Sequence, residues 1–138
     1  MNRKLILGLV AIVAMGAGVS RADKIEIDLH DYDDDLMRQL EQTLKYFEPD
    51  VTDGNLNSYA DDVQQIQYTF GYVKGYFEKQ GPNAAKGVEI AQQGLDLLAA
   101  IDKDVKAKNF SSAGDKAHQF FLICRSCHDV YKPNNARS

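Results

Sequence analysis

Apolar residues recur every three or four positions through most of the chain after residue 22, which is the spacing of one face of an α-helix. Four segments follow this pattern. No segment alternates apolar and polar residues for long enough to predict a sheet. The sequence therefore predicts an all-α protein.

The first two predicted helices have clear ends. The first begins in the acidic cluster 31–35, where carboxylates suit the positive end of a helix, and ends at Phe47, before Pro49. The second begins near Asn57 and ends at Gln80, because Gly81 and Pro82 follow. Their predicted inward stripes are Tyr32, Leu36, Leu40, Leu44 and Phe47, flanked by Met37, and then Tyr59, Val63, Ile66, Phe70, Val73 and Phe77.

Two further helices complete the predicted fold. The third follows Pro82 and ends near Lys108. The fourth begins at Ser112, which with Asp115 has the form of a capping box, and ends at Pro133. Short links between helices of similar length favour antiparallel neighbours, so we predict an antiparallel up-down-up-down four-helix bundle in one domain, residues 23–138.

Residues 1–22 have the pattern of a secretory signal peptide. Arg3 and Lys4 precede an apolar run of fifteen residues from Leu5 to Val19, and a small-x-small cleavage pattern ends at Ala22. A membrane-spanning helix needs about 20 apolar residues, so this run is too short to be one. We predict cleavage after Ala22, export to the periplasm, and no membrane span in the mature chain; an uncleaved anchor is the alternative.

The net charge of the chain indicates which kinds of partner to expect. The chain has 16 Lys and Arg residues against 20 Asp and Glu. The predicted signal peptide carries Arg3, Lys4 and Arg21 but no acidic residue, so its removal changes the net charge from −4 to −7. An acidic surface argues against nucleic acid and anionic membranes as partners and favours a protein with a basic docking patch.

The motif that carries chemistry is C-x-x-C-H at residues 124–128, the attachment sequence of c-type haem. Thiols one helical turn apart, at Cys124 and Cys127, can form thioethers to the two vinyl groups of one porphyrin, and the next residue, His128, can offer a nitrogen to the iron. Helical spacing places them on one face, which we predict to be buried with the haem: Ala113, Ala117, Phe120, Phe121, Cys124, Cys127, His128 and Tyr131.

Three other uses of the two thiols are possible: a disulfide, a redox-active thiol pair and half of a zinc site. A zinc site needs a second pair of ligands, and only His30 and His118 lie outside the motif. A thioredoxin-like pair would need a strand and a βαβ unit, which the pattern lacks. Haem attachment is therefore the leading interpretation, and a haem-free thiol or metal protein stays as an alternative.

With its signal peptide, four helices and one C-x-x-C-H near the C-terminus, the chain resembles the class II c-type cytochromes, the cytochrome c′ family. The specific motif is CRSCHDVY, residues 124–131. The resemblance implies one covalent haem c on Cys124 and Cys127, His128 as the proximal ligand, and the usual aromatic residue at Tyr131. It also implies that the first helix supplies the residue on the other side of the iron, and that Arg38 pairs with a haem propionate.

The sixth ligand has several candidates. Met37 is the only methionine left after residue 22, and it lies on or beside the inward face of the first helix, where gap-filling is its alternative role. Alignments with the family place either Leu40, which would leave the iron open, or Gln42 at this position, although helical geometry turns Gln42 outward. His30 is a third possible ligand, and Leu44 could also line an open iron.

The second helix has a separate feature. Tyr68, Tyr72 and Tyr76 recur every four residues opposite its core stripe, beside Gly71 and Gly75. This face could form a homodimer, since family members often dimerise through the first two helices; solvent exposure and packing within the chain are the alternatives.

These features predict a periplasmic monohaem cytochrome that carries single electrons and exchanges them with redox partner proteins. A thioether ligand from Met37 keeps the iron six-coordinate and suits electron transfer. The alternative is a five-coordinate protein that binds small gases such as nitric oxide or carbon monoxide. The sequence has no catalytic acid–base pair, nucleophile triad or phosphate-binding loop, so we do not predict an enzyme.

Overall fold

The structure is a computed structural model and describes residues 23–133, so the predicted signal peptide, residues 1–22, lies outside the described residues. Its four long helices are α1 (Asp34–Thr52), α2 (Tyr59–Glu78), α3 (Ala85–Lys106) and α4 (Phe110–Val130), with a short 3₁₀ turn, η1 (Pro82–Ala84), before α3. The prediction of a mainly helical bundle is confirmed. Within residues 23–133, no helix is long and apolar enough to cross a membrane.

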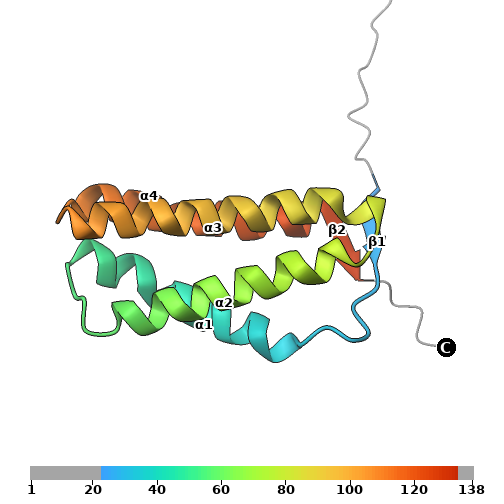
Figure 1. Ribbon diagram of the computed structural model, residues 1–138, viewed down its shortest axis with the longest axis horizontal. Helices are drawn as coiled ribbons and strands as arrows, with labels where there is room; N and C mark the ends of the chain where they lie inside the picture. The colour runs from blue at the N-terminus through green and yellow to red at the C-terminus, as the bar shows by residue number, and fades with distance from the viewer. Residues whose placement is uncertain (1–22, 134–138) are drawn as a thin grey trace, which may run out of the picture.

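The helices form two layers around one core. Figure 1 shows α3 and α4 side by side above α1 and α2. Each helix packs against the next one along the chain, and α4 also packs against α1. The largest fully buried side chains come from all four helices: Phe47, Val51, Ile66, Thr69, Ile101 and Phe120. Each helix thus buries one mainly apolar side, and this burial is the main source of stability.

Glycines allow the layers to approach closely at two places. A Cβ atom on Gly114 of α4 would collide with the side chain of Thr52 at the end of α1. A Cβ atom on Gly94 of α3 would collide in the same way with the ring of Phe70 on α2. Both glycines are buried, so their lack of a side chain sets the spacing between these helices.

The predicted end of the first helix at Phe47 is wrong. Helix α1 continues through Pro49 to Thr52, and Val51, in this extra turn, is fully buried. Pro49 removes one helical hydrogen bond, but burial of Val51 offsets that loss. The turn after the helix uses Gly54, whose φ of +68° favours glycine.

The predicted capping box at Ser112 is also wrong. Helix α4 begins two residues earlier, at Phe110, so Ser112 lies inside its first turn. The Ser112 hydroxyl donates instead to a carboxylate oxygen of Asp104 on α3, at 2.7 Å, and Lys116 pairs with the same carboxylate. Lys116 and Ser112 together lower the pKa of Asp104. A tertiary network, not a cap, explains this serine.

The structure adds two short strands that the periodicity did not predict. Strand β1 (Ile25–Ile27) pairs in parallel with β2 (Tyr131–Pro133), in a register that sets Ile25 opposite Tyr131. Helix α4 therefore ends at Val130, before the predicted end at Pro133. Figure 1 places this pair at the end of the bundle where α4 finishes. The start of the described chain thus meets the residues that follow the C-x-x-C-H motif.

Candidate functional site

The two cysteines of the motif lie in the last two turns of α4. Both are half-buried and neither forms a disulfide. Burial raises the pKa of the Cys127 thiol to about 11, and Cys124 adds to this shift. Burial also raises the pKa of Cys124, and the carboxylate of Glu41 on α1 adds to it. Both thiols are therefore protonated near neutral pH, unlike the low-pKa cysteines of thiol redox enzymes.

His128 directly follows the second thiol and is exposed. Within residues 23–133, its imidazole has no hydrogen-bond or ion-pair partner. Its backbone carbonyl, in contrast, accepts a hydrogen bond from Lys24 Nζ at 2.6 Å. The backbone of this residue is held, while the ring nitrogens stay available to a ligand.

One side of α4 is covered by α1 in its first half and uncovered in its second half. Gly114 packs against Thr52, and His118 Nδ1 lies 2.9 Å from Glu48 Oε2; both partners belong to the C-terminal half of α1. About one and three turns beyond His118, along the same side, are Phe121 and His128, and both are exposed. In Figure 1 the first turns of α1 lie farther from α4 than its last turns.

The face predicted to be buried with the haem includes Phe121, which is exposed in this structure. Its side chain is 64% exposed, whereas Phe120 beside it is 1% exposed. The helical spacing was correct, but no part of the described chain covers this side of α4. Phe121 lies one turn from Cys124 and two turns from His128, whose imidazole has no partner among residues 23–133, and a flat apolar group could cover this surface.

The predicted distal residues Met37, Leu40 and Gln42 lie on α1 as expected, but the α1 residue that acts on a motif thiol is Glu41, which was not predicted. Met37 is half-buried against the main core, and Leu40 is buried in it. The carboxylate of Glu41, one turn after Met37, helps to raise the pKa of the Cys124 thiol. Arg38 is exposed and pairs with Asp35 on its own helix. Gln42 is exposed, in agreement with its outward prediction.

The other two histidines are surface residues. His30 Nδ1 lies 2.9 Å from Asp31 Oδ1 in a highly exposed pair. His118 is exposed and pairs with Glu48, as described above. Among residues 23–133, no group of three or more His, Cys, Asp or Glu side chains is arranged to hold a metal ion. Neither histidine joins the motif cysteines, which is what a zinc site would require.

Two of the three tyrosines on α2 pack within the chain. The Tyr72 and Tyr76 rings lie 5.4 and 5.0 Å from the ring of Tyr32, each in an edge-on arrangement. Tyr32 therefore belongs to this cluster before α1 rather than to the inward stripe of the first helix. Only Tyr68 is strongly exposed, and added Cβ atoms on Gly71 and Gly75 would meet nothing. The surface left for a dimer is smaller than predicted.

The pattern missed the residues that anchor the end of α4. The hydroxyl of Tyr131 donates to the carbonyl of Asn83 at 3.0 Å and accepts from the backbone N–H of Gly87 at 2.8 Å. Its ring packs at 5.1 Å from Phe77, in a small apolar cluster that also contains Ile27 and contacts Cys127. The alternation Ile25-Glu26-Ile27 was the only local signal, and three residues are too few to predict a strand.

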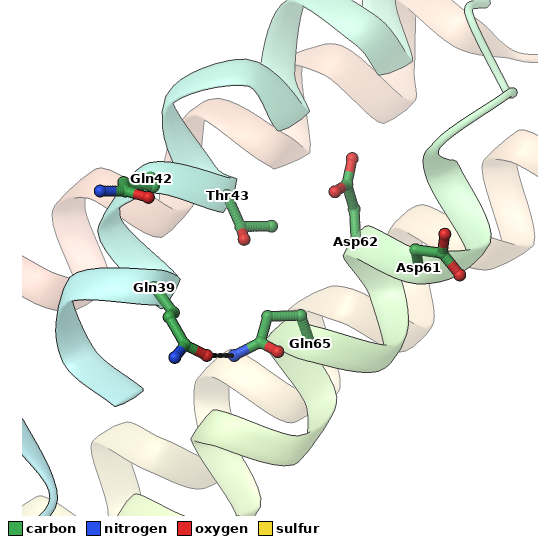
Figure 2. Close-up of a pocket in the computed structure, with 6 residues that line it drawn as sticks. All are labelled: Gln39, Gln42, Thr43, Asp61, Asp62 and Gln65. Atoms are coloured by element: carbon green, nitrogen blue, oxygen red, sulfur yellow. Dashed lines mark hydrogen bonds between the residues drawn. The ribbon is translucent and has the colours of Figure 1, made fainter. Parts of the chain in front are cut away.

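Two cavities lie away from the motif. One of about 310 Å³ lies between α1 and α2, and Figure 2 shows its polar lining, in which Gln65 Nε2 donates to Gln39 Oε1 at 3.4 Å. The other, of about 510 Å³, lies over Gly71 and Gly75. Neither is lined by Cys124, Cys127 or His128. Neither of these two is therefore a candidate haem site, and of the three motif residues only His128 is exposed, while the two cysteines are half-buried.

The donor set at the end of α4 fits a haem group. Two unpaired thiols one turn apart, an adjacent imidazole without a partner in the described chain, and an exposed apolar ring match what covalent attachment, axial ligation and porphyrin packing each require. No protein-family model, curated protein or solved structure matches this chain. The assignment therefore rests on these residues.

Proposed function

We propose that the chain is an exported monohaem c-type cytochrome, similar to the class II cytochromes, that carries single electrons in the periplasm and is not an enzyme. In this proposal the helices run up-down-up-down and antiparallel, with haem beside α4. The observation that carries the proposal is the arrangement of Cys124, Cys127 and His128 at the end of α4, next to the uncovered apolar side at Phe121. When bound, haem supplies an iron that gains and loses one electron.

Each residue of the motif has a distinct role. Cys124 and Cys127 hold the porphyrin covalently, so the group cannot dissociate. His128 provides the proximal nitrogen. Phe121, whose ring is exposed, packs on the apolar face of the porphyrin and keeps water from that side of the site. Arg38, exposed one turn into α1, is the proposed partner of a propionate, in exchange for its contact with Asp35.

Met37 is the proposed sixth ligand. It lies on α1, five residues after Tyr32 and four before Glu41. Cys127 contributes to the raised pKa of Tyr32, and Glu41 contributes to that of Cys124, so both neighbours of Met37 in the chain lie close to a motif thiol. A thioether there would limit rearrangement on electron transfer. The competing proposal is a gas-binding protein with an open iron beside Leu40. It is favoured by one observation: Met37 already packs against the main core.

The proposed partner is a redox protein with a basic docking patch. Exposed acidic residues crowd the segment before α1 and its first turn, near Tyr32 and the motif: Asp28, Asp31, Asp33, Asp34 and Asp35. Opposite charge on a partner would accelerate encounter at this end of the molecule. Homodimer formation through α1 and α2 remains part of the proposal, with Tyr68 as its exposed aromatic residue.

The test is to produce the full chain in a host that attaches haem c and to measure its mass and visible spectra. We expect one covalent haem, and none in a matched variant with both cysteines changed to serine. His128→Ala should keep the haem but lose normal ligation. A mass without haem would contradict the proposed function and favour the alternative of a haem-free thiol or metal protein.

The same preparation distinguishes electron transfer from gas binding. A low-spin oxidised spectrum with a weak far-red methionine band, unchanged by carbon monoxide after reduction, would support Met37. Met37→Leu should then open the sixth position, and Arg38→Gln serves as a control one residue away. A high-spin spectrum that shifts with carbon monoxide in the unmodified protein would favour the gas-binding proposal.

A further inference from the structure

Residues 24–32, here called the N-terminal strap, include β1 and lead across the end of the bundle to α1. It contacts His128, the last residue of the C-x-x-C-H motif, and Tyr131, three residues later. Lys24 Nζ donates to the carbonyl of His128 at 2.6 Å, and Ile25 pairs with Tyr131 in the strand register. These contacts join residues more than 100 positions apart, so they belong to the fold and not to local sequence.

The strap is itself fixed to α2. The carbonyl of Asp28 accepts hydrogen bonds from the Tyr76 hydroxyl at 2.8 Å and from Gln80 Nε2 at 3.2 Å. Near its other end, Tyr32 packs edge-on against Tyr76, as described above. Ile27, in its middle, is 6% exposed and packs in the cluster that contacts Cys127. The strap therefore has its own anchors, independent of the contacts it makes to α4.

The end of α4 depends on these contacts. The last carbonyls of a helix lack helical partners, and Lys24 satisfies that of His128. Beyond the helix, Lys132 lies 3.3 Å from Glu26 across the strand pair, and the Tyr131 hydroxyl binds backbone groups of η1 and of the first turn of α3. The turn that carries His128 is thus held from two directions while its imidazole remains exposed.

We propose that the N-terminal strap is a positioning element for His128: by fixing the last turn of α4, it holds the imidazole where the iron needs it. This inference rests on the proposed function for the ligand role of His128. The fixation of the last turn is a property of the chain alone. Lys24, Ile27 and Tyr131 are positioning residues, since none of them is proposed to contact the iron.

The first test compares Ile27→Asp with Ile25→Asp in the full chain without haem. Both variants place the same charge on the same strand, but Ile25 is 37% exposed and Ile27 is buried. Amide hydrogen exchange at residues 127–131 should become about tenfold faster in Ile27→Asp and stay within about twofold in Ile25→Asp, because only the first loses the buried contact. Unchanged exchange in α2 and α3 would exclude general unfolding.

The second test measures whether this fixation reaches the imidazole. Ile27→Ala removes most of the buried side chain of the strap without adding a charge, and Ile25→Ala is the control on the same strand, where the side chain is 37% exposed. Protons compete with iron for the imidazole nitrogen, so tenfold weaker positioning should raise the acid midpoint of the visible-spectrum change by about one pH unit. Both variants keep the charged side chains on the strap and around His128: Lys24, Arg125, Asp129 and Lys132.

The outcomes separate the two proposals. Equal exchange in Ile27→Asp and Ile25→Asp would overturn the strap. Faster exchange in Ile27→Asp without a change of the acid midpoint in Ile27→Ala would overturn the role of the strap in positioning His128. A chain whose mass contains no haem would overturn the proposed function, and the exchange comparison would still decide whether the strap holds the end of α4.

Discussion

The two halves of α4 differ on one side of the helix: α1 covers this side in the first half and leaves it exposed in the second. In the first half, Ala113 and Ala117 are buried, Gly114 allows α1 to approach, and His118 meets Glu48 at the edge of that contact. In the second half, the equivalent side carries Phe121 and His128, which are exposed. Small residues create a helix contact in the first half, and large or polar residues occupy an uncovered surface in the second.

This difference shows which side of α4 the described chain leaves uncovered. A surface phenylalanine is ordinary when isolated, but here it shares one side of a helix with an exposed imidazole and borders two half-buried thiols. The first half of α4 is explained by packing against α1. In the proposed function, haem would cover the second half.

The largest expected effect concerns the Cys127 thiol in the chain without haem. Its pKa is raised from the ordinary value of 9.0 to about 11, so at neutral pH about 100-fold less thiolate is present, and only the thiolate reacts. Alkylation of Cys127 by iodoacetamide, followed by peptide mass analysis, should therefore keep rising about tenfold per pH unit from pH 7 to about 10.

The unfolded chain is the control for this measurement. In denaturant the burial is lost, and the alkylation rate of both cysteines should level off near the ordinary thiol pKa. A folded chain in which Cys127 also levels off near pH 9 would mean that its thiol is exposed. The second half of α4 would then resemble a reactive thiol pair more than a site of covalent attachment.

A smaller effect is expected at the close contact in the first half. Gly114→Ala places a methyl group against Thr52 and should destabilise the fold by about 1–3 kcal/mol, because the α1–α4 spacing must widen. The matched variant Gly71→Ala meets no atom and should stabilise α2 by about 0.5–1 kcal/mol, since alanine favours helix. Denaturant unfolding measures both, and equal effects would show that Gly114 does not set the spacing.

Much of the fold was predictable from periodicity. The helices 59–78 and 85–106 fall within a few residues of their predicted ends, because apolar spacing and the Gly81-Pro82 break are local signals. The end of α1 was not predictable in the same way. Pro49 is a local stop signal, and only the tertiary burial of Val51 overrides it. Strands β1 and β2 likewise depend on contacts between the two ends of the chain.

The candidate site likewise has a part that local sequence predicts and a part that depends on tertiary contacts. The spacing of Cys124, Cys127 and His128 identifies the donor set, since it needs only one helix. The exposure of Phe121 could not be predicted, because a helical angle gives the side on which a residue lies but not where a neighbouring helix stops covering it. The roles of Lys24 and Tyr131 were missed for a related reason: each depends on partners far away in the sequence.

The smallest expected effect tests the uncovered side directly. Phe121→Ser should change the stability of the chain without haem by less than about 0.5 kcal/mol, because its ring is exposed. With haem attached, the same change should cost about 1–2 kcal/mol, since the porphyrin would bury that ring. Leu122→Ser is the control: Leu122 is 56% exposed but lies about 100° around the helix, so its effect should be small in both forms. Thermal or denaturant unfolding of the four preparations gives the comparison. An equal cost of Phe121→Ser with and without haem would mean that the group does not lie over this side of α4, and the site would have to be rebuilt on the face toward Glu41.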